Sequence, residues 1–102
     1  MAKIPTSFTL FGQEIKVLFR KTLVKKHKAV GMWNSNENKI ELQTSTKALP
    51  INADNIESTL WHEIVHAILD KNSYDNLNED EEFVDRMANS IREVINTAKY
   101  KD

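Results

Sequence analysis

The sequence contains no cysteine and only two glycines and two prolines among its 102 residues. The absence of cysteine excludes a disulfide scaffold, a thiolate zinc finger and a cysteine nucleophile. So few glycines and prolines exclude a collagen-like or low-complexity chain. Residues 1–12 hold no apolar run long enough for a signal peptide, and no run approaches the roughly 20 apolar residues that span a bilayer. We therefore expect a cytoplasmic protein without a membrane segment.

The remaining composition is that of a globular protein, with 40% hydrophobic and 28% charged residues. This length predicts one domain over residues 1–102, large enough to bury a hydrophobic core without covalent cross-links. We expect a monomer.

Charge is divided unevenly along the chain, although the net charge is only -1. Residues 1–40 carry eight basic and two acidic side chains, whereas residues 41–102 carry six basic and thirteen acidic ones. A basic half can bind nucleic acid, but no aromatic residues are interleaved with these cations. We interpret the division as a solvated sheet face beside an acidic helical half, and do not expect a nucleic-acid partner.

The first half of the chain predicts short strands, at about residues 8–10, 15–19, 29–33 and 39–43. Gly12-Gln13 suits a tight turn, and the polar run 34–38 suits a hairpin loop. Residues 21–28 fit either a basic loop or one helical turn. In the last strand, Ile40 and Leu42 are expected on the buried face, with Lys39, Glu41 and Gln43 on the exposed face.

After Pro50 the hydrophobic period changes from two to 3.6, which predicts helices. Asn52 or Asp54 could cap a first helix that runs to about Lys71. A second helix is expected over about residues 78–98, with a buried stripe of Val84, Met87, Ala88, Ile91 and Ile95. The predicted class is α+β: a small antiparallel-type sheet followed by two helices.

The first helix is apolar around more than half of its circumference, so its polar residues collect in one narrow strip. They are Thr59, His62, Glu63, His66 and Asp70. A helix this apolar is buried on most sides, and buried polar groups are costly unless they have partners. The strip therefore predicts a functional or strongly hydrogen-bonded site.

The run His62-Glu63-Ile64-Val65-His66 in this strip fits the pattern His-Glu-x-x-His. Two imidazoles four residues apart on a helix share a face and can reach one Zn²⁺ at about 2.0–2.1 Å. Glu63 between them is placed to act as the general base on a zinc-bound water. Two ordinary hydrogen-bonded histidines are the alternative, which leaves the polar strip unexplained.

A catalytic zinc site needs a third protein ligand, and no histidine follows His66. A carboxylate from the second helix is the remaining source. Glu81 falls beside the core stripe of that helix, whereas Glu82 falls on its solvent side. Asp80 is also geometrically possible, so Glu81 is the preferred ligand but not the only candidate.

His62-Glu63-x-x-His66 followed by Glu81-x-x-Val84-Asp85 resembles the signature of the gluzincin metallopeptidases. The sequence is most similar to the small phage- and prophage-type members, over roughly residues 8–95. Val84 departs from that signature, since a smaller residue is usual there.

This resemblance implies a zinc peptidase in which His62, His66 and Glu81 hold the metal and Glu63 is the general base and acid. It also implies that Asp85 orients a ligand imidazole. Asp70, one turn after His66, could do the same.

We therefore expect a zinc-dependent metallopeptidase that cleaves peptide bonds of a specific protein substrate. The strand around Ile40 and Leu42 could bind an extended peptide by strand addition. Candidate donors to the oxyanion are Tyr74, Tyr100 and His27, none with a spacing argument. The alternative is a zinc-containing, non-catalytic binding module, such as a phage-type protein that docks on a host protein.

Overall fold

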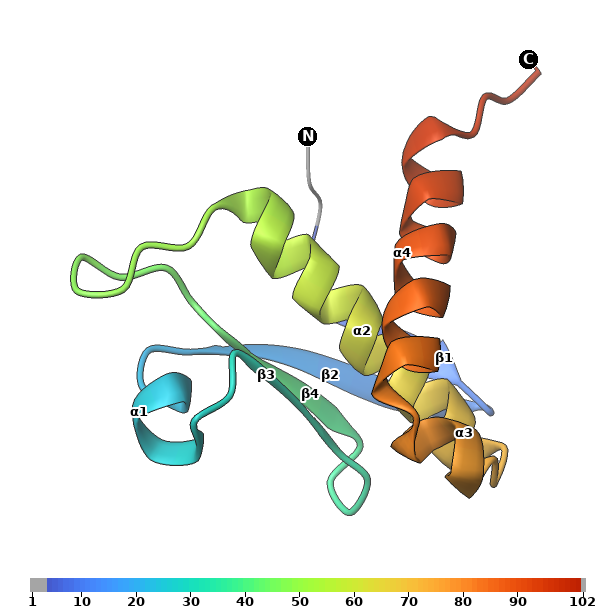
Figure 1. The fold of residues 1–102 in the computed structure, drawn as a ribbon, viewed down its shortest axis with the longest axis horizontal. Coiled ribbons are helices and arrows are strands. Elements are labelled where there is room, and N and C mark those ends of the chain that lie inside the picture. Colours follow the sequence, from blue (N-terminus) through green and yellow to red (C-terminus); the bar gives the residue numbers. More distant parts are fainter. Residues whose placement is uncertain (1–3, 102) are drawn as a thin grey trace.

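The structure, a computed structural model, describes residues 4–101 and is a four-stranded sheet with helices (Figure 1). Within that range no helix is long and apolar enough to cross a membrane. The elements in chain order are β1 (Ser7–Leu10), β2 (Gln13–Arg20), α1 (Leu23–His27), β3 (Gly31–Asn34), β4 (Lys39–Gln43), α2 (Ala53–Lys71), α3 (Asp75–Glu79) and α4 (Glu81–Thr97). The expected α+β class is confirmed.

The sheet has the order β1-β2-β4-β3 and is mixed, so the expected antiparallel-type sheet is corrected. β1 pairs with β2, and β3 with β4, in antiparallel fashion. β2 and β4 are parallel, with Val17 opposite Ile40. The parallel pair arises because the connection through α1 carries the chain past β2 to the outer strand β3. The following hairpin then returns β4 alongside β2, in the same direction.

Residues 21–28, which fitted either a basic loop or one helical turn, contain the short helix α1. The position of α1 depends on Gln43. The Gln43 side chain accepts a hydrogen bond from the Val24 N–H (2.9 Å) and donates one to the Lys21 carbonyl (2.8 Å). Gln43 is 1% exposed, so its expected place on the wet face of the strand was wrong. Its amide satisfies backbone groups at the start of α1, which is why a polar residue is buried there.

Helix α2 packs across one face of the sheet and contributes to the main core. Asn52 is its N-cap, because its side chain accepts from the Asn55 N–H at 2.8 Å. The buried core residues on the sheet and on α2 are Ile15, Val17, Ile40, Leu42, Leu60 and Ile64. This packing fixes the rotation of α2 about its axis, and so fixes where its polar strip faces.

The second expected helix is divided in two, because Asp80 interrupts it. Asp80 adopts an extended conformation and caps α4 by accepting from the Phe83 N–H at 3.0 Å. Within the expected stripe, Val84 and Ala88 are buried against α2, whereas Met87 and Ile95 are exposed. The stripe prediction was therefore partly wrong. The C-terminal part of α4 diverges from α2 (Figure 1), and the apolar side chains of Val94 and Ile95 there are exposed.

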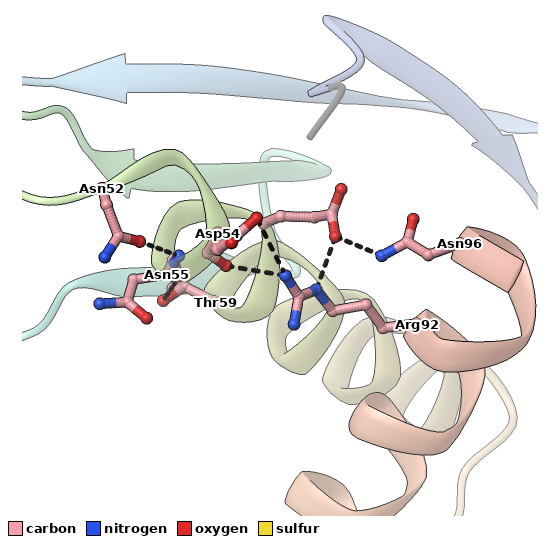
Figure 2. A network of polar contacts seen from close by, with 7 residues as sticks. Asn52, Asp54, Asn55, Thr59, Arg92 and Asn96 are labelled. Atoms are coloured by element: carbon pink, nitrogen blue, oxygen red, sulfur yellow. Dashed lines mark hydrogen bonds and ion pairs between the residues drawn. The ribbon is translucent and has the colours of Figure 1, made fainter. Parts of the chain in front are cut away.

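A polar network joins α2 and α4 where the two helices diverge (Figure 2). Arg92 Nε lies 2.6 Å from Glu57 Oε1, and the Asn96 side-chain amide donates to the same oxygen at 2.8 Å. Arg92 also reaches the carbonyl of Asp54 at 3.3 Å. The Glu57 side chain is only 5% exposed, so its charge depends on these partners.

Candidate metal centre

His62, His66 and Glu81 meet between α2 and the first turn of α4. The two imidazole rings lie edge to face with centroids 4.9 Å apart. The Glu81 carboxylate spans them, with Oε2 at 3.0 Å from His62 Nε2 and Oε1 at 3.2 Å from His66 Nε2. One ligand atom from each residue lies within 4.8 Å of the others. The structure thus brings together the three side chains that the sequence singled out.

The spacing of these atoms suits a zinc ion. Zinc ligands at about 2.0–2.2 Å in a tetrahedron lie roughly 3.3 Å from one another. The two nitrogen–oxygen separations of 3.0 and 3.2 Å are near that value, but each is to a different oxygen of Glu81. One ligand atom from each of the three residues lies within 4.8 Å of the others. Two neutral imidazoles and one carboxylate are also a ligand set that zinc accepts, with a fourth position left for water.

The other two carboxylates considered as third ligand lie elsewhere. Glu82 forms an exposed ion pair with Arg86 at 3.3 Å, one turn along α4. Asp80 caps α4 with its side chain. The geometry therefore favours Glu81 over both.

Asn78, in the short helix α3, contacts the ring nitrogen of His66 that faces away from Glu81 and so fixes the orientation of the imidazole. His66 Nδ1 lies 2.6 Å from Asn78 Oδ1, so Nδ1 carries the proton that is donated to this oxygen. In this tautomer Nε2 is the nitrogen that faces the Glu81 carboxylate, at 3.2 Å. A metal cation between this nitrogen and the carboxylate would be bound by both.

The two aspartates expected to orient imidazoles behave differently. Asp85 Oδ1 lies 3.7 Å from His62 Nδ1, which is close but too long for a hydrogen bond. Asp70, for which a histidine contact was only a possibility, instead accepts a hydrogen bond from the Trp33 indole at 2.8 Å. Asp70 lies on the side of the polar strip that faces the sheet. Its hydrogen bond with Trp33 therefore links α2 to β3.

Glu63 is buried between the histidines and the sheet, with 9% of its surface exposed. Burial raises the pKa of its carboxyl, and the effect is opposed by His66, His62 and a hydrogen bond with the Trp33 backbone. This carboxylate lies beside two potential metal ligands and is not itself in the ligand cluster. A partly desolvated carboxylate with a raised pKa is suited to accept and return a proton.

Gly31 allows the start of β3 to lie directly against α2 beside Thr59 and Glu63. A Cβ atom at Gly31 would lie 2.5 Å from Thr59 Cγ2 and 3.1 Å from Glu63 Cγ. Only glycine leaves room for this approach. The strand backbone therefore forms one wall of the site and restrains the Glu63 side chain.

A groove of about 460 Å³ opens beside the three-residue cluster, with His62, Glu63 and Asp85 in its lining. Gly31, at the start of β3, lines it as well. β3 is an outer strand among those described, whereas β4 has neighbours on both sides. Strand addition at Ile40 and Leu42 was therefore wrong, because β4 has no free edge. The groove is lined instead by residues 28–31, which lead into β3.

None of the three candidate oxyanion donors, Tyr74, Tyr100 and His27, lines this groove. Tyr74 and Tyr100 are exposed, and His27 lines a separate cavity with Arg20 and Glu41. The cation that does line the groove is Lys28, which has a left-handed backbone conformation at the end of α1. Sequence reasoning missed Lys28, since nothing in a run of basic residues distinguishes one lysine from its neighbours.

No known protein-family model matches the chain, and no curated protein and no solved structure shows a significant match to it. The resemblance to gluzincins therefore rests on the motif residues alone, and a function can be proposed only from the site.

Proposed function

We propose that this protein is a zinc-dependent peptidase. The observation that carries the proposal is the convergence of His62, His66 and Glu81, with one ligand atom from each within 4.8 Å of the others, and with the buried Glu63 beside them. The three ligand candidates come from two helices whose packing is determined by the core, so their meeting is a property of the fold. Asn78 supports it, because it leaves Nε2 of His66 free to ligate.

Each part of the site has a defined task in amide hydrolysis. Bound zinc would polarise the scissile carbonyl and lower the pKa of water. Glu63 would accept the proton of the attacking water and deliver it to the leaving amine. Its raised pKa favours this exchange, since a base that holds its proton more strongly can both take and return it near neutral pH.

The surroundings of the site favour an extended peptide as substrate. The outer strand β3 can pair with such a peptide through its backbone groups. Residues 28–31, which lead into β3, line the groove together with His62 and Glu63, so a peptide paired at the start of this strand would lie near the reactive groups. A domain of 102 residues offers few subsites, which favours a limited set of protein substrates.

The variant Glu63→Gln tests the proposal, because it keeps the shape of the side chain and removes the base. Purified wild-type protein and Glu63→Gln should each bind about one zinc, since the ligands are unchanged. Cleavage of a peptide library should fall by a factor of about 10² or more in the variant. Glu14→Gln, at an exposed position on β2, is the control and should cleave normally.

The non-catalytic binding module is the competing function, and one observation favours it: none of the three expected oxyanion donors lines the groove. If wild-type protein binds zinc and Glu63→Gln and wild type act equally on the library, the peptidase proposal is wrong. The absence of zinc after reconstitution at neutral pH would defeat both functions.

A further inference from the structure

The groove at the metal centre has side chains of opposite charge in its lining. Lys28 lines it at the end of α1, and Asp85, with 63% of its side chain exposed, lines it on α4. The helix α1 lies well apart from α3 and α4 (Figure 1). The charge of a bound molecule therefore affects which way round it lies in the groove.

Lys28 belongs to a group of four lysines on and beside α1, called here the α1 lysines: Lys21, Lys25, Lys26 and Lys28. All four are exposed, and none has an ion-pair partner among residues 4–101. The cations on the neighbouring strands differ, because Arg20 and Lys39 both contact Glu41. The positive charge of the α1 lysines is thus available to a partner from outside.

The backbone that carries these lysines is held by the fold. Leu23 is 2% exposed, and the Gln43 amide bonds to Lys21 and Val24 at the start of α1. At its end the Lys28 N–H donates to the Val24 carbonyl at 2.8 Å, with Lys28 in the left-handed conformation. The position of Lys28 beside the groove is therefore a property of the folded chain.

The opposite side of the groove is strongly acidic. Besides Glu81, the exposed acids on α3 and on the first half of α4 are Asp75, Glu79, Asp80, Glu82 and Asp85. Fields of this kind act over about 8 Å at physiological salt. A carboxylate in the groove is thus attracted towards α1 and repelled from α4.

The distance from Lys28 to the reactive groups corresponds to a short stretch of peptide. Gly31 lies beside Glu63, since a Cβ at Gly31 would be 3.1 Å from Glu63 Cγ. Lys28 precedes Gly31 by three residues, and an extended chain advances about 3.3 Å per residue. A side chain that reaches Lys28 is therefore within about three residues of a bond beside Glu63.

We propose that Lys28, assisted by the other α1 lysines, binds an aspartate or glutamate of the substrate within about three residues of the cleaved bond. The proposal rests on the proposed peptidase function, for which it names the substrate class: an extended peptide that is acidic on one side of the bond. Lys28 is a specificity determinant and takes no part in the chemistry.

Binding can be measured without cleavage in zinc-loaded Glu63→Gln protein labelled with ¹⁵N. The probes are N-acetyl-Ala-Glu-Ala-Glu-Ala-Glu-Ala-amide and its analogues with glutamine or lysine in place of glutamate. The glutamate peptide should shift the amide signals of Lys28, Ala29 and Gly31. It should bind about threefold or more tightly than the glutamine peptide, the effect of one or two exposed ion pairs, and the lysine peptide more weakly than both. High salt should remove the difference.

Two substitutions of Lys28 in this protein test the local charge. Lys28→Asn removes it with a residue that tolerates the left-handed conformation, and should weaken glutamate-peptide binding about twofold or more. Lys28→Glu should reverse the preference, so that the lysine peptide binds more tightly. Lys16→Glu, at an exposed position on β2 outside the groove lining, makes the same change in net charge and should keep the wild-type preference. Thermal melting verifies that all three are folded.

The outcomes distinguish this proposal from the peptidase function. Equal binding of the glutamate and glutamine peptides, shifts confined to other residues, or equal effects of Lys16→Glu and Lys28→Glu would overturn the acidic-residue site. An oligothymidylate that gives the same shifts and binds more tightly would also overturn it, in favour of nucleic acid. If wild-type protein cleaves a peptide library without preference for acidic residues, the site falls and the peptidase function stands. If the glutamate peptide binds at Lys28 but wild-type protein cleaves nothing, the site stands and the peptidase function falls.

Discussion

Asn78 Oδ1 lies 2.6 Å from His66 Nδ1 and accepts a hydrogen bond from it, which leaves Nε2 as the nitrogen of His66 that can bind a metal. The contact links α3, a helix of five residues, to the middle of α2. Its effect is to keep the proton on Nδ1, so that the lone pair of Nε2 points toward Glu81. A short and mostly exposed helix thus orients a half-buried ligand candidate.

Replacing Asn78 by alanine should weaken zinc binding about 10–100-fold, the usual effect of losing a partner that orients a ligand. The affinity is measured by competition with a chromophoric chelator. Asn76→Ala is the control, because Asn76 is exposed on the same short helix. Asn78→Asp, which keeps an acceptor oxygen, should bind better than Asn78→Ala. Equal affinity in the three variants would contradict the role of Asn78.

The third ligand is tested by comparing Glu81→Gln with Glu82→Gln. Glu81→Gln should lower zinc affinity strongly, since a charged ligand is lost from the cation. Glu82→Gln should change it little, because this carboxylate pairs with Arg86 on the exposed side of α4. Competitive chelation of both proteins decides between them. A loss confined to Glu82→Gln would overturn the assignment of Glu81.

The parts of this site that the sequence predicted depend on local geometry. Helical spacing alone places His62 and His66 on one face. The hydrophobic stripe of the second helix turns Glu81 toward α2, although 68% of its side chain remains exposed. The cap Asn52 was recognisable because its hydrogen bond spans three residues. Such relations hold wherever the helix packs, so they are readable before the tertiary structure is known.

The parts that sequence reasoning missed depend on contacts between distant segments. Nothing near Asn78 indicates that it will lie behind His66, twelve residues earlier. Asp70 has the correct spacing for a histidine partner, but Trp33 from β3 takes its oxygen instead. The parallel pairing of β2 with β4 similarly follows from the path of the chain through α1. Tertiary packing determines which side chains and strands come into contact, and a local sequence pattern does not contain that information.

The network at Arg92 should stabilise the pair α2–α4. Arg92→Met removes the bond to the buried Glu57 and should lower the free energy of unfolding by about 1.5–3 kcal/mol. Arg86→Met is the matched control, because its pair with Glu82 has side chains 79% and 77% exposed. Such exposed pairs contribute only about 0–1 kcal/mol. Chemical denaturation measures the free energy of unfolding of both variants. Similar losses of stability in the two would contradict the view that the buried pair contributes more than the exposed one.

The contact between Arg20 and Glu41 on the sheet should make stability depend on pH. Arg20 Nε lies 2.7 Å from Glu41 Oε2, and this bond holds the pKa of Glu41 below its ordinary value. A lowered folded pKa means that the stabilisation is present above the unfolded pKa and is lost as pH falls through the folded value. Glu41→Gln should therefore be less stable than wild type at pH 7, by about 1 kcal/mol or less since Arg20 is partly exposed. The difference should vanish at low pH, and a difference independent of pH would contradict this account.

The last prediction concerns Gly31, where β3 meets α2. Gly31→Ala introduces a Cβ 2.5 Å from Thr59 Cγ2, so the strand or the helix must move. We expect a loss of about 1–3 kcal/mol in the free energy of unfolding, as for other overpacked contacts, together with reduced peptidase activity because Glu63 shifts. Thr59→Ser deletes the clashing methyl group and keeps the hydroxyl that donates to the Asn55 carbonyl at 2.9 Å.

The double variant Gly31→Ala with Thr59→Ser should recover part of the stability and activity lost in Gly31→Ala. Measurement of both single variants completes the cycle, and a coupling energy of about 0.5 kcal/mol or more is expected for residues in contact. Gly12→Ala is the control, because Gly12 has φ +72° and no atom within 4 Å of the added Cβ. It should cost about 1 kcal/mol of backbone strain and leave activity intact. If Thr59→Ser restores nothing, steric contact with Thr59 is not the reason for glycine at position 31.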